Sequence, residues 1–331
     1  MSGPSPPRAL ASQLVEAARG SVRAVLLYGS QLLRTRPDEH SAFDFVVLVE
    51  AYRPFYAGLR ASGQLPRPVW LMSTLARVLA PNVIAFAPEE GRAGIAKCLV
   101  VSRADFERAL GPMPRDHFLL GRMVQRVAVV WAADPGEERW VQERLAGARA
   151  RVLDWLAPYL EGPVDAAGLG RRLLEVCYQG ELRPEARDRA QKIYQAQDDY
   201  FREALAPVLE RAVVEGRVVR EGAGAPTSSA AMPPAGTPPA STRYALACPA
   251  TSAERRRWRG HFRRSKARAT ARWLKHTLTF ANWLPYIVRK VERHTGRTIH
   301  LTPLERKLPL IFLWPRAVHV LLSRPQRELR P

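Results

Sequence analysis

Short apolar runs alternate with longer amphipathic segments through the first part of the chain. The apolar runs have the length of buried strands and lie at 22–28, 43–50, 83–87, 96–102 and 127–131. The segments between them carry apolar residues at helical spacing and lie near 9–20, 52–62 and 69–79. Strands mixed with helices in this way predict an α/β domain with a mixed sheet over residues 1–135.

The pattern changes after the turn predicted at Asp134-Pro135-Gly136. From there apolar positions recur about every 3.6 residues, which predicts a helical second domain over residues 136–220. Residues 221–243 are rich in proline, alanine, glycine and serine, and such a segment cannot bury enough apolar surface to fold. We therefore expect a linker there and a separate unit over residues 244–331.

The C-terminal unit begins with an arginine-rich segment that continues into an amphipathic one. In a helical projection Trp273 and Phe280 lie on one side, and Arg272, Lys275 and His276 lie off that side. Basic residues beside an aromatic and aliphatic face are typical of a helix that lies in a membrane interface. We therefore expect a basic amphipathic helical extension that docks on a membrane.

The net charge of +20 is concentrated in the same unit, because the chain from Glu254 onward has 20 lysines and arginines against 4 glutamates. A localised basic segment indicates a polyanionic partner. An anionic membrane surface is the partner we expect; nucleic acid, or simple packing of this unit on the rest of the protein, is the alternative. The longest apolar runs are shorter than the roughly 18 to 20 residues that span a bilayer, which predicts peripheral association.

The cysteines and histidines show no pattern of a functional site. The 3 cysteines have neither disulfide nor metal-ligand spacing, which favours reduced thiols in an intracellular protein. The 7 histidines show no metal-ligand or catalytic-triad spacing, so we expect all of them to be packed or solvated.

The strongest chemical signal is the end of the first predicted strand, Tyr28-Gly29-Ser30, followed by Asp44 near the start of the second. Gly29 allows the backbone to approach a triphosphate closely, and the Ser30 hydroxyl can donate to phosphate. Asp44 can hold Mg²⁺ against the same triphosphate. This layout is typical of a nucleotidyltransferase active site.

The expected partner of Asp44 is missing, because Ala42 stands where sites of this kind carry a second carboxylate. Two carboxylates two residues apart would face the same side of the strand and hold two metals about 4 Å apart. The site is therefore a one-carboxylate variant, a site whose second ligand comes from elsewhere, or a relic. The other candidate acids are Asp38, Glu39 and Glu50. The even spacing between Asp44 and Glu50 favours Glu50 as the second metal ligand.

An ordered set of motifs over about residues 15–220 resembles the mitochondrial-type CDP-diacylglycerol synthases, the family of translocator assembly and maintenance proteins. Each motif is short, and their common order and spacing carry the resemblance. The motifs are, in chain order, Tyr28-Gly29-Ser30, Phe43-Asp44-Phe45-Val46, Leu79-Ala80-Pro81-Asn82-Val83-Ile84, Lys97, Gly121-Arg122-Met123 and Tyr178-Gln179-Gly180-Glu181-Leu182-Arg183.

The resemblance implies a nucleotidyltransferase domain joined to a helical, winged-helix-like domain. It implies a phosphatidate cytidylyltransferase that uses Mg²⁺ to condense CTP with phosphatidic acid, releasing pyrophosphate and CDP-diacylglycerol. Members of this family are peripheral membrane proteins of mitochondria and of some bacteria. For this chain we expect the cytoplasmic face of a bacterial inner membrane, with the matrix side of the mitochondrial inner membrane as the alternative.

The resemblance also implies roles for single residues. Asp44 matches the strand acid of the family, and Lys97 matches a strand lysine that suits a charge contact to the triphosphate, so we expect both to be catalytic. The nucleotide- and phosphate-binding residues that it implies are Gly29, Ser30 and Arg122. The residues that it implies for the lipid-phosphate or substrate site are Tyr178, Gly180, Glu181 and Arg183.

The chain also departs from the family pattern in places. Gln31 stands where a further glycine is usual, and Glu181 and Leu182 replace an aspartate and a phenylalanine. Ala42 agrees with the family, which has an apolar residue where other nucleotidyltransferases have the first acid. Two other functions stay open: a nucleotidyltransferase that acts on RNA, protein or a small molecule, and a non-catalytic nucleotide- or membrane-binding relative.

Overall fold

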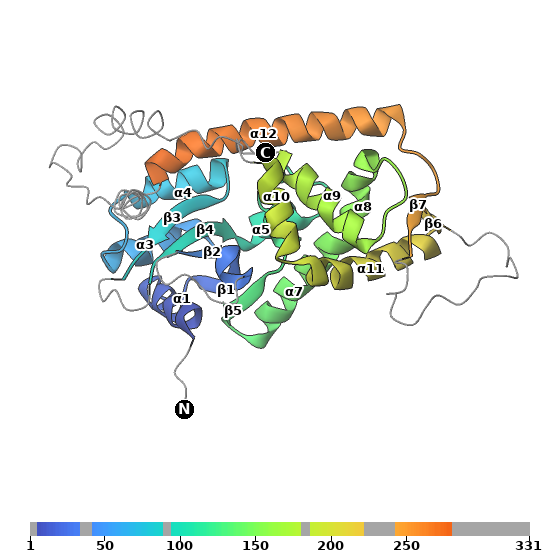
Figure 1. The fold of residues 1–331 in the computed structure, drawn as a ribbon. Coiled ribbons are helices and arrows are strands. Elements are labelled where there is room, and N and C mark those ends of the chain that lie inside the picture. The colour runs from blue at the N-terminus through green and yellow to red at the C-terminus, as the bar shows by residue number, and fades with distance from the viewer. Residues whose placement is uncertain (1–4, 34–41, 89–93, 180–185, 222–241, 280–331) are drawn as a thin grey trace, which may run out of the picture.

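The computed structural model of the protein describes residues 5–33, 42–88, 94–179, 186–221 and 242–279. Predictions that lie outside these residues concern Gly180, Glu181, Arg183, Asp38, Glu39, the body of the linker and the chain beyond residue 279. Within the described residues the chain forms a five-stranded sheet with helices on both faces (Figure 1).

The sheet is mixed in strand direction. Its strands are β1 (Val22–Tyr28), β2 (Phe43–Val49), β3 (Asn82–Phe86), β4 (Ala96–Ser102) and β5 (Ala128–Ala132), in the spatial order β3-β4-β2-β1-β5. β2 and β4 run parallel, and the other neighbouring pairs run antiparallel. Each predicted apolar run forms one of these strands, and the predicted α/β class with a mixed sheet is confirmed.

The central strands are buried on both faces, which explains why they read as continuous apolar runs. On one face Val25 and Val47 pack with Phe55 and Met72. The helices that cover this face are α1 (Pro6–Ala17), α3 (Tyr52–Ala61) and α4 (Val69–Val78).

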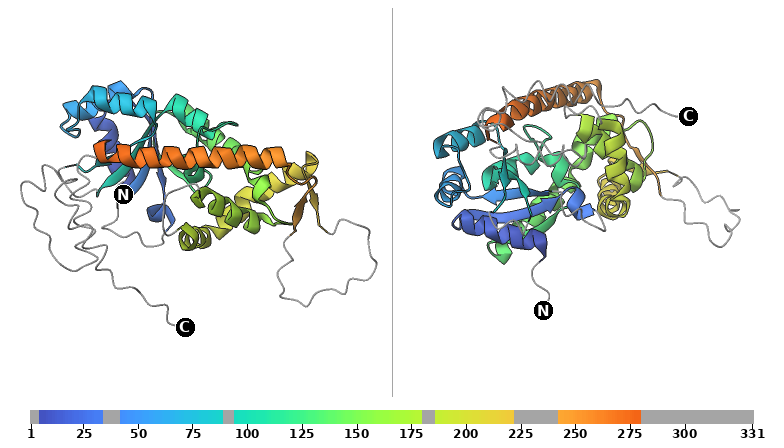
Figure 2. Two further views of the ribbon diagram at one scale, coloured as in Figure 1. Left: turned by 90° about the horizontal axis from the view of Figure 1, so that it is seen from above. Right: turned by 60° about the vertical axis from the view of Figure 1, so that its left-hand side comes forward.

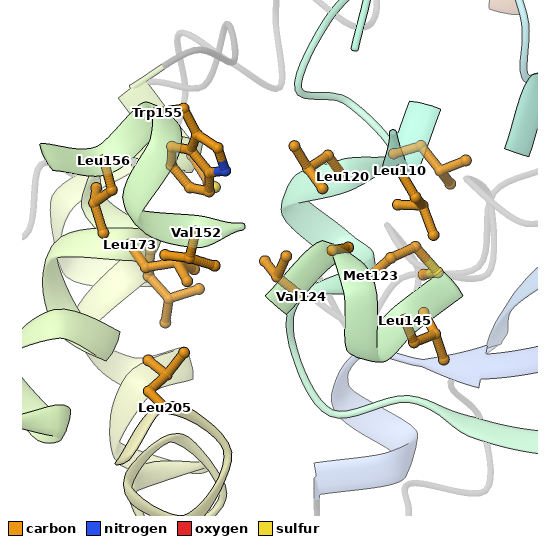
Figure 3. Close-up of a cluster of buried hydrophobic side chains, with 14 of the residues drawn as sticks. Leu110, Leu120, Met123, Val124, Leu145, Val152, Trp155, Leu156, Leu173 and Leu205 are labelled. Atoms are coloured by element: carbon orange, nitrogen blue, oxygen red, sulfur yellow. The ribbon is translucent and has the colours of Figure 1, made fainter. Parts of the chain in front are cut away.

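The helices that follow β4 and β5 lie on the side of the opposite face, which is contacted directly by the first helix after each of these strands. They are α5 (Arg103–Leu110), α6 (Leu120–Met123), α7 (Pro135–Ala150), α8 (Val152–Leu156), α9 (Ala166–Gln179), α10 (Ala186–Gln195) and α11 (Asp198–Val214). Their apolar side chains form one cluster with Val46 of the sheet. Figure 3 shows Leu120 and Met123 on one side of this cluster and Val152 and Leu156 on the other. The predicted boundary between residues 135 and 136 therefore lies inside one hydrophobic core.

A small second sheet joins the two ends of the predicted linker. β6 (Val218–Arg220) lies just before the linker, β7 (Tyr244–Leu246) lies just after it, and the two strands pair antiparallel. Tyr244 also forms a β-bridge with Val164, ahead of α9. The chain that follows the linker is thus tied to the helical region, where the sequence predicted a separate unit.

The chain after β7 forms α12 (Ser252–Thr279), a long helix that runs over both the sheet and the helical region (Figures 1 and 2). It contacts β3 and the short 3₁₀ turn Ala157–Tyr159. Among the helices of the described residues, none has both the length and the apolar character that crossing a membrane requires.

The buried side of α12 is mostly polar. Its buried side chains recur at helical spacing and are Trp258, His261, Ser265, Arg272, Lys275 and Thr279. The exposed side of its first half is basic and carries Arg255, Arg256, Arg259, Arg263, Arg264 and Lys266. The projection placed Arg272 and Lys275 off the predicted membrane face, and the structure shows that their side of the helix faces the core. The predicted membrane face itself, with Trp273 and Phe280, lies outside the described side chains.

Candidate functional site

Three side chains that the sequence singled out form a row across the centre of the sheet. Tyr28 at the end of β1 pairs with Asp44 at the start of β2, and Asp44 pairs with Lys97 at the start of β4. Paired residues of neighbouring strands point to the same face, and their strands lie about 5 Å apart. The row faces the same side as Val46 and Leu99, two residues further along their strands, and this is the side that α5 and α7 contact.

Gly29 brings the backbone directly against the Asp44 carboxylate. Its φ of +81° lies in the left-handed region, and a Cβ built on it would lie 2.9 Å from Asp44 Oδ2. Ser30 follows as the exposed first residue of the short helix α2 (Ser30–Leu33). The structure thus brings together the three residues predicted for the phosphate and metal site, and the Asp44 carboxylate occupies the place that a side chain at residue 29 would fill.

Arg122 and Tyr178 lie on α6 and α9, two helices that pack against each other. A Cβ on Gly121 would lie 3.1 Å from the Cβ of Cys177, so these helices approach closely only because residue 121 is glycine. Arg122, the next residue, places its guanidinium 4.0 Å from the centre of the Phe118 ring and donates to the Phe118 carbonyl. Tyr178, next to Cys177, is half-buried against the same hydrophobic cluster.

His276 of α12 joins this group, although no sequence pattern had selected it. Its ring centre lies 6.5 Å from that of Phe118, and its Nε2 is buried without a hydrogen-bond partner among the described residues. Burial, together with nearby positive charges that include those of Lys97 and Arg122, lowers the pKa of His276 to about 3. A strand, a short helix and the C-terminal helix therefore direct three nitrogen-bearing side chains to one region.

Asp116 anchors α12 at this point. Its carboxylate accepts from Arg268 Nε at 2.8 Å and from Arg272 Nη2, and Arg272 Nε donates to the carbonyl of Ala80 at 2.8 Å. The Arg272 guanidinium also lies 4.7 Å from the centre of the Phe118 ring. Although burial opposes it, the charges of Arg272 and Arg268 hold the pKa of Asp116 below its usual range.

Lys275 fixes the same helix to the segment before β3. Its Nζ donates to the carbonyl of Pro81 and to Asn82 Oδ1, each at 2.9 Å, and to the carbonyl of Leu79. Asn82 Nδ2 in turn donates at 2.8 Å to the hydroxyl of Tyr56. The Leu79-Ala80-Pro81-Asn82 motif therefore serves as the docking place of α12 in this structure.

Glu50 lies at the opposite end of β2 from Asp44. Six residues of strand separate the two carboxylates by about 20 Å, so they cannot share a metal ion. Glu50 instead forms an ion pair with Arg23 at 3.7 Å, and Arg23 also reaches Glu137 at 2.9 Å. Even spacing along a strand places two side chains on the same face of the sheet but does not bring them close together. The structure therefore corrects the prediction that Glu50 completes the site.

The residues at the sheet end fit a magnesium ion held together with a substrate. Mg²⁺ binds through one or two carboxylates, substrate phosphate oxygens and water, and Asp44 against the backbone of Gly29 provides such a carboxylate. Within the described ranges, no three or more histidine, cysteine, aspartate or glutamate side chains gather as a metal-binding group. The magnesium ion would therefore depend on the bound substrate for most of its ligands.

Comparison with known proteins adds no family assignment. No protein-family model matches the chain, and no curated protein matches it. The geometry of the row and the motifs in the sequence are therefore the observations that bear on function.

Proposed function

We propose that the protein is a magnesium-dependent nucleotidyltransferase that transfers CMP from CTP to phosphatidic acid. The observation that carries this proposal is the row of Tyr28, Asp44 and Lys97, with Gly29 packed against the Asp44 carboxylate. It combines a carboxylate, a cation and a side-chain-free backbone segment, which are the groups that a metal-bound triphosphate requires. The ordered motifs, through the family that they resemble, indicate CTP and phosphatidic acid as the two substrates.

The cations around the row would neutralise the triphosphate. Lys97 next to Asp44 and Arg122 on α6 suit the β- and γ-phosphates, and the backbone at Gly29 and the Ser30 hydroxyl suit the remaining phosphate oxygens. A magnesium ion on Asp44 would add further neutralisation of the leaving pyrophosphate.

The transfer is an in-line displacement. An oxygen of the phosphatidate phosphate forms a bond to the α-phosphorus of CTP, and the bond from that phosphorus to the oxygen of the β-phosphate breaks, so pyrophosphate leaves. The attacking phosphate is already ionised at neutral pH, and no base is required. The side chains therefore act by holding both phosphates in line and by neutralising charge as it moves to pyrophosphate.

His276 fits a binding role in the same reaction. With a pKa of about 3 it is neutral at pH 7, so it adds no charge among Lys97, Arg122 and Arg272. Its buried Nε2 offers a hydrogen-bonding atom to a substrate, and α12, which carries it, packs against the sheet at β3. We assign to His276 a hydrogen bond to a substrate oxygen.

The helical region and α12 suit the acceptor side of the reaction. The helices α9 to α11 with the two-stranded sheet β6–β7 agree with the winged-helix-like domain that the resemblance implies, and Tyr178 lies at the end of α9 that faces α6. Gly180, Glu181 and Arg183 keep the substrate role that the resemblance gives them. The exposed basic side of α12 would bind an anionic membrane at about 1 kcal/mol for each engaged cation, as expected of a peripheral protein on the cytoplasmic face of a bacterial inner membrane.

Transfer of label from [α-³²P]CTP tests the proposal. The protein with Mg²⁺ and phosphatidic acid in vesicles should yield labelled CDP-diacylglycerol, and Asp44→Asn should yield none. Glu50→Gln is the matched control, because it removes an acid from the far end of the same strand and should keep full activity. Label that appears on RNA instead would support the alternative nucleotidyltransferase, and CTP binding without transfer to any acceptor would support a non-catalytic relative.

A further inference from the structure

A solvent-open pocket lies beside α12, on the edge formed by the end of α4, α5 and the segment before α6. Its lining includes the guanidinium-bearing side chains Arg77, Arg108, Arg115, Arg268 and Arg272. Tyr28, Asp44, Lys97 and Arg122 are absent from the lining residues, so the pocket is separate from the row on the sheet.

The lining carries an excess of positive charge. Two carboxylates, Asp105 and Asp116, face five arginines, which leaves a net charge of +3 on the pocket wall. Asp105 already accepts from the Tyr52 hydroxyl at 2.6 Å and pairs with Arg108 at 3.2 Å. Asp116 is engaged by two arginines of α12, so neither carboxylate is left to balance the other cations.

Two arginines at the rim supply most of this excess. Arg77 at the end of α4 and Arg115 before α6 are exposed, and neither forms an ion pair with a described residue. At the base, Arg272 is held rigidly by Asp116 and the carbonyl of Ala80, and its side chain is 2% exposed. Its Nη1 is buried and has no hydrogen-bond partner within the described residues. The pocket thus combines a fixed, incompletely satisfied guanidinium with two others that can close over a ligand.

We infer that this pocket binds a phosphate group, with Arg77, Arg115, Arg268 and Arg272 as its principal contacts. A guanidinium group can donate two parallel hydrogen bonds to two oxygens of one phosphate. An excess of three positive charges also suits a phosphate dianion better than a single carboxylate. The phosphate belongs either to a soluble phosphate compound or to the headgroup of a phosphatidate lipid. The inference does not depend on the transfer reaction proposed above.

Calorimetric titration of inorganic phosphate at constant ionic strength tests the site on the full chain. The variant Arg77→Gln/Arg115→Gln should bind phosphate about tenfold more weakly, since two charge-assisted hydrogen-bond donors are lost. Both residues are exposed and unpaired, so the thermal unfolding midpoint should not change. The matched control is Arg53→Gln/Arg139→Gln, which removes the same charge from exposed arginines outside the pocket and should bind as the wild type does.

A second arm distinguishes the source of the phosphate. Sedimentation with phosphatidylcholine vesicles that contain phosphatidic acid is compared between the two double variants. If the pocket variant loses only vesicle binding, the site takes a lipid phosphate. If it loses only free-phosphate binding, the site takes a soluble phosphate. Loss of both supports a site that takes either. Equal binding of the pocket and control variants in both arms overturns the inference.

Discussion

Two groups of charged side chains lie within this protein, and they differ in what surrounds them. In the α12 contact, Arg272 and Lys275 are buried and donate to Asp116, to backbone carbonyls and to Asn82. In the row on the sheet, Asp44 and Lys97 are half-buried, and the Asp44 carboxylate lies directly against the backbone of Gly29. The first group has the form of a structural clamp, and the second has the form of a ligand site. Substitutions should therefore affect stability in one group and activity in the other.

The largest effect is expected from Asp44→Asn. Transfer of CMP should fall by roughly 1,000-fold, because the variant loses the charge that holds magnesium and the triphosphate. The free energy of unfolding should change by less than about 1 kcal/mol, because the amide has the same shape and the site is half-buried. Product formation from labelled CTP and urea unfolding measure the two quantities. An equally inactive Glu50→Gln variant would contradict this assignment.

The next effect is expected from Arg272→Met, which leaves Asp116 buried with one fewer cation. The free energy of unfolding should fall by about 3 to 5 kcal/mol, as for other buried pairs that lose one partner. Arg263→Met is the matched control, since it removes an exposed arginine from the same helix and should change stability by about 0.5 kcal/mol or less. Urea unfolding measures both, and equal stability of the two variants would show that the clamp does not hold α12.

Acid should weaken another contact of α12, the one it makes with the segment before α6. His117 lies on the segment before α6, and its Nδ1 lies 2.8 Å from Nε2 of His261 on α12. Burial, together with the charge of His261, lowers the pKa of His117 to about 3. The unfolded chain binds this proton below about pH 6.5 and the folded protein does not, so stability is complete above that pH and falls as the pH decreases. At pH 5 the loss from His117 should be about 2 kcal/mol. Urea unfolding at pH 7 and pH 5 should show a smaller difference for His117→Gln than for the wild type.

The smallest effect is expected from His276→Phe, which keeps a ring but removes its nitrogens. The value of kcat/KM for CTP should fall about tenfold through loss of one hydrogen bond to a charged oxygen. His276→Gln should recover most of that activity, because its amide can hydrogen-bond from a similar position. Unchanged kinetics in His276→Phe would assign the residue to packing alone.

The sheet and its row were predictable because buried strands leave a simple pattern. Each apolar run became a strand, and Asp44 was visible as the one acid at the start of such a run. Glu50 was predicted wrongly because alternation gives the face of a residue and says nothing of its distance along the strand. The pairing of Asp44 with Lys97 could not be predicted, because it depends on β2 and β4 being neighbours in the sheet, and local sequence patterns do not show strand order.

The position of α12 was not predictable in the same way. Its projection used apolar residues to define a face, whereas its described buried side is held by hydrogen bonds and ion pairs to partners more than 150 residues away, such as Asp116 and Asn82. His276 was set aside for the same reason, because its role depends on a tertiary contact with Phe118. The linker composition indicated a break in the fold, yet β6 and β7 pair across it.

The central claim is that Asp44 and its row form a site for a metal-bound triphosphate, and calorimetric titration of CTP at pH 7 tests it most directly. The titration is made with Mg²⁺ and with EDTA, on the wild type and on Asp44→Asn. We predict that Mg²⁺ strengthens CTP binding to the wild type at least about tenfold and has little effect on binding to the variant. A wild type that binds CTP equally with and without Mg²⁺, or a variant that keeps the full effect of Mg²⁺, would contradict the account.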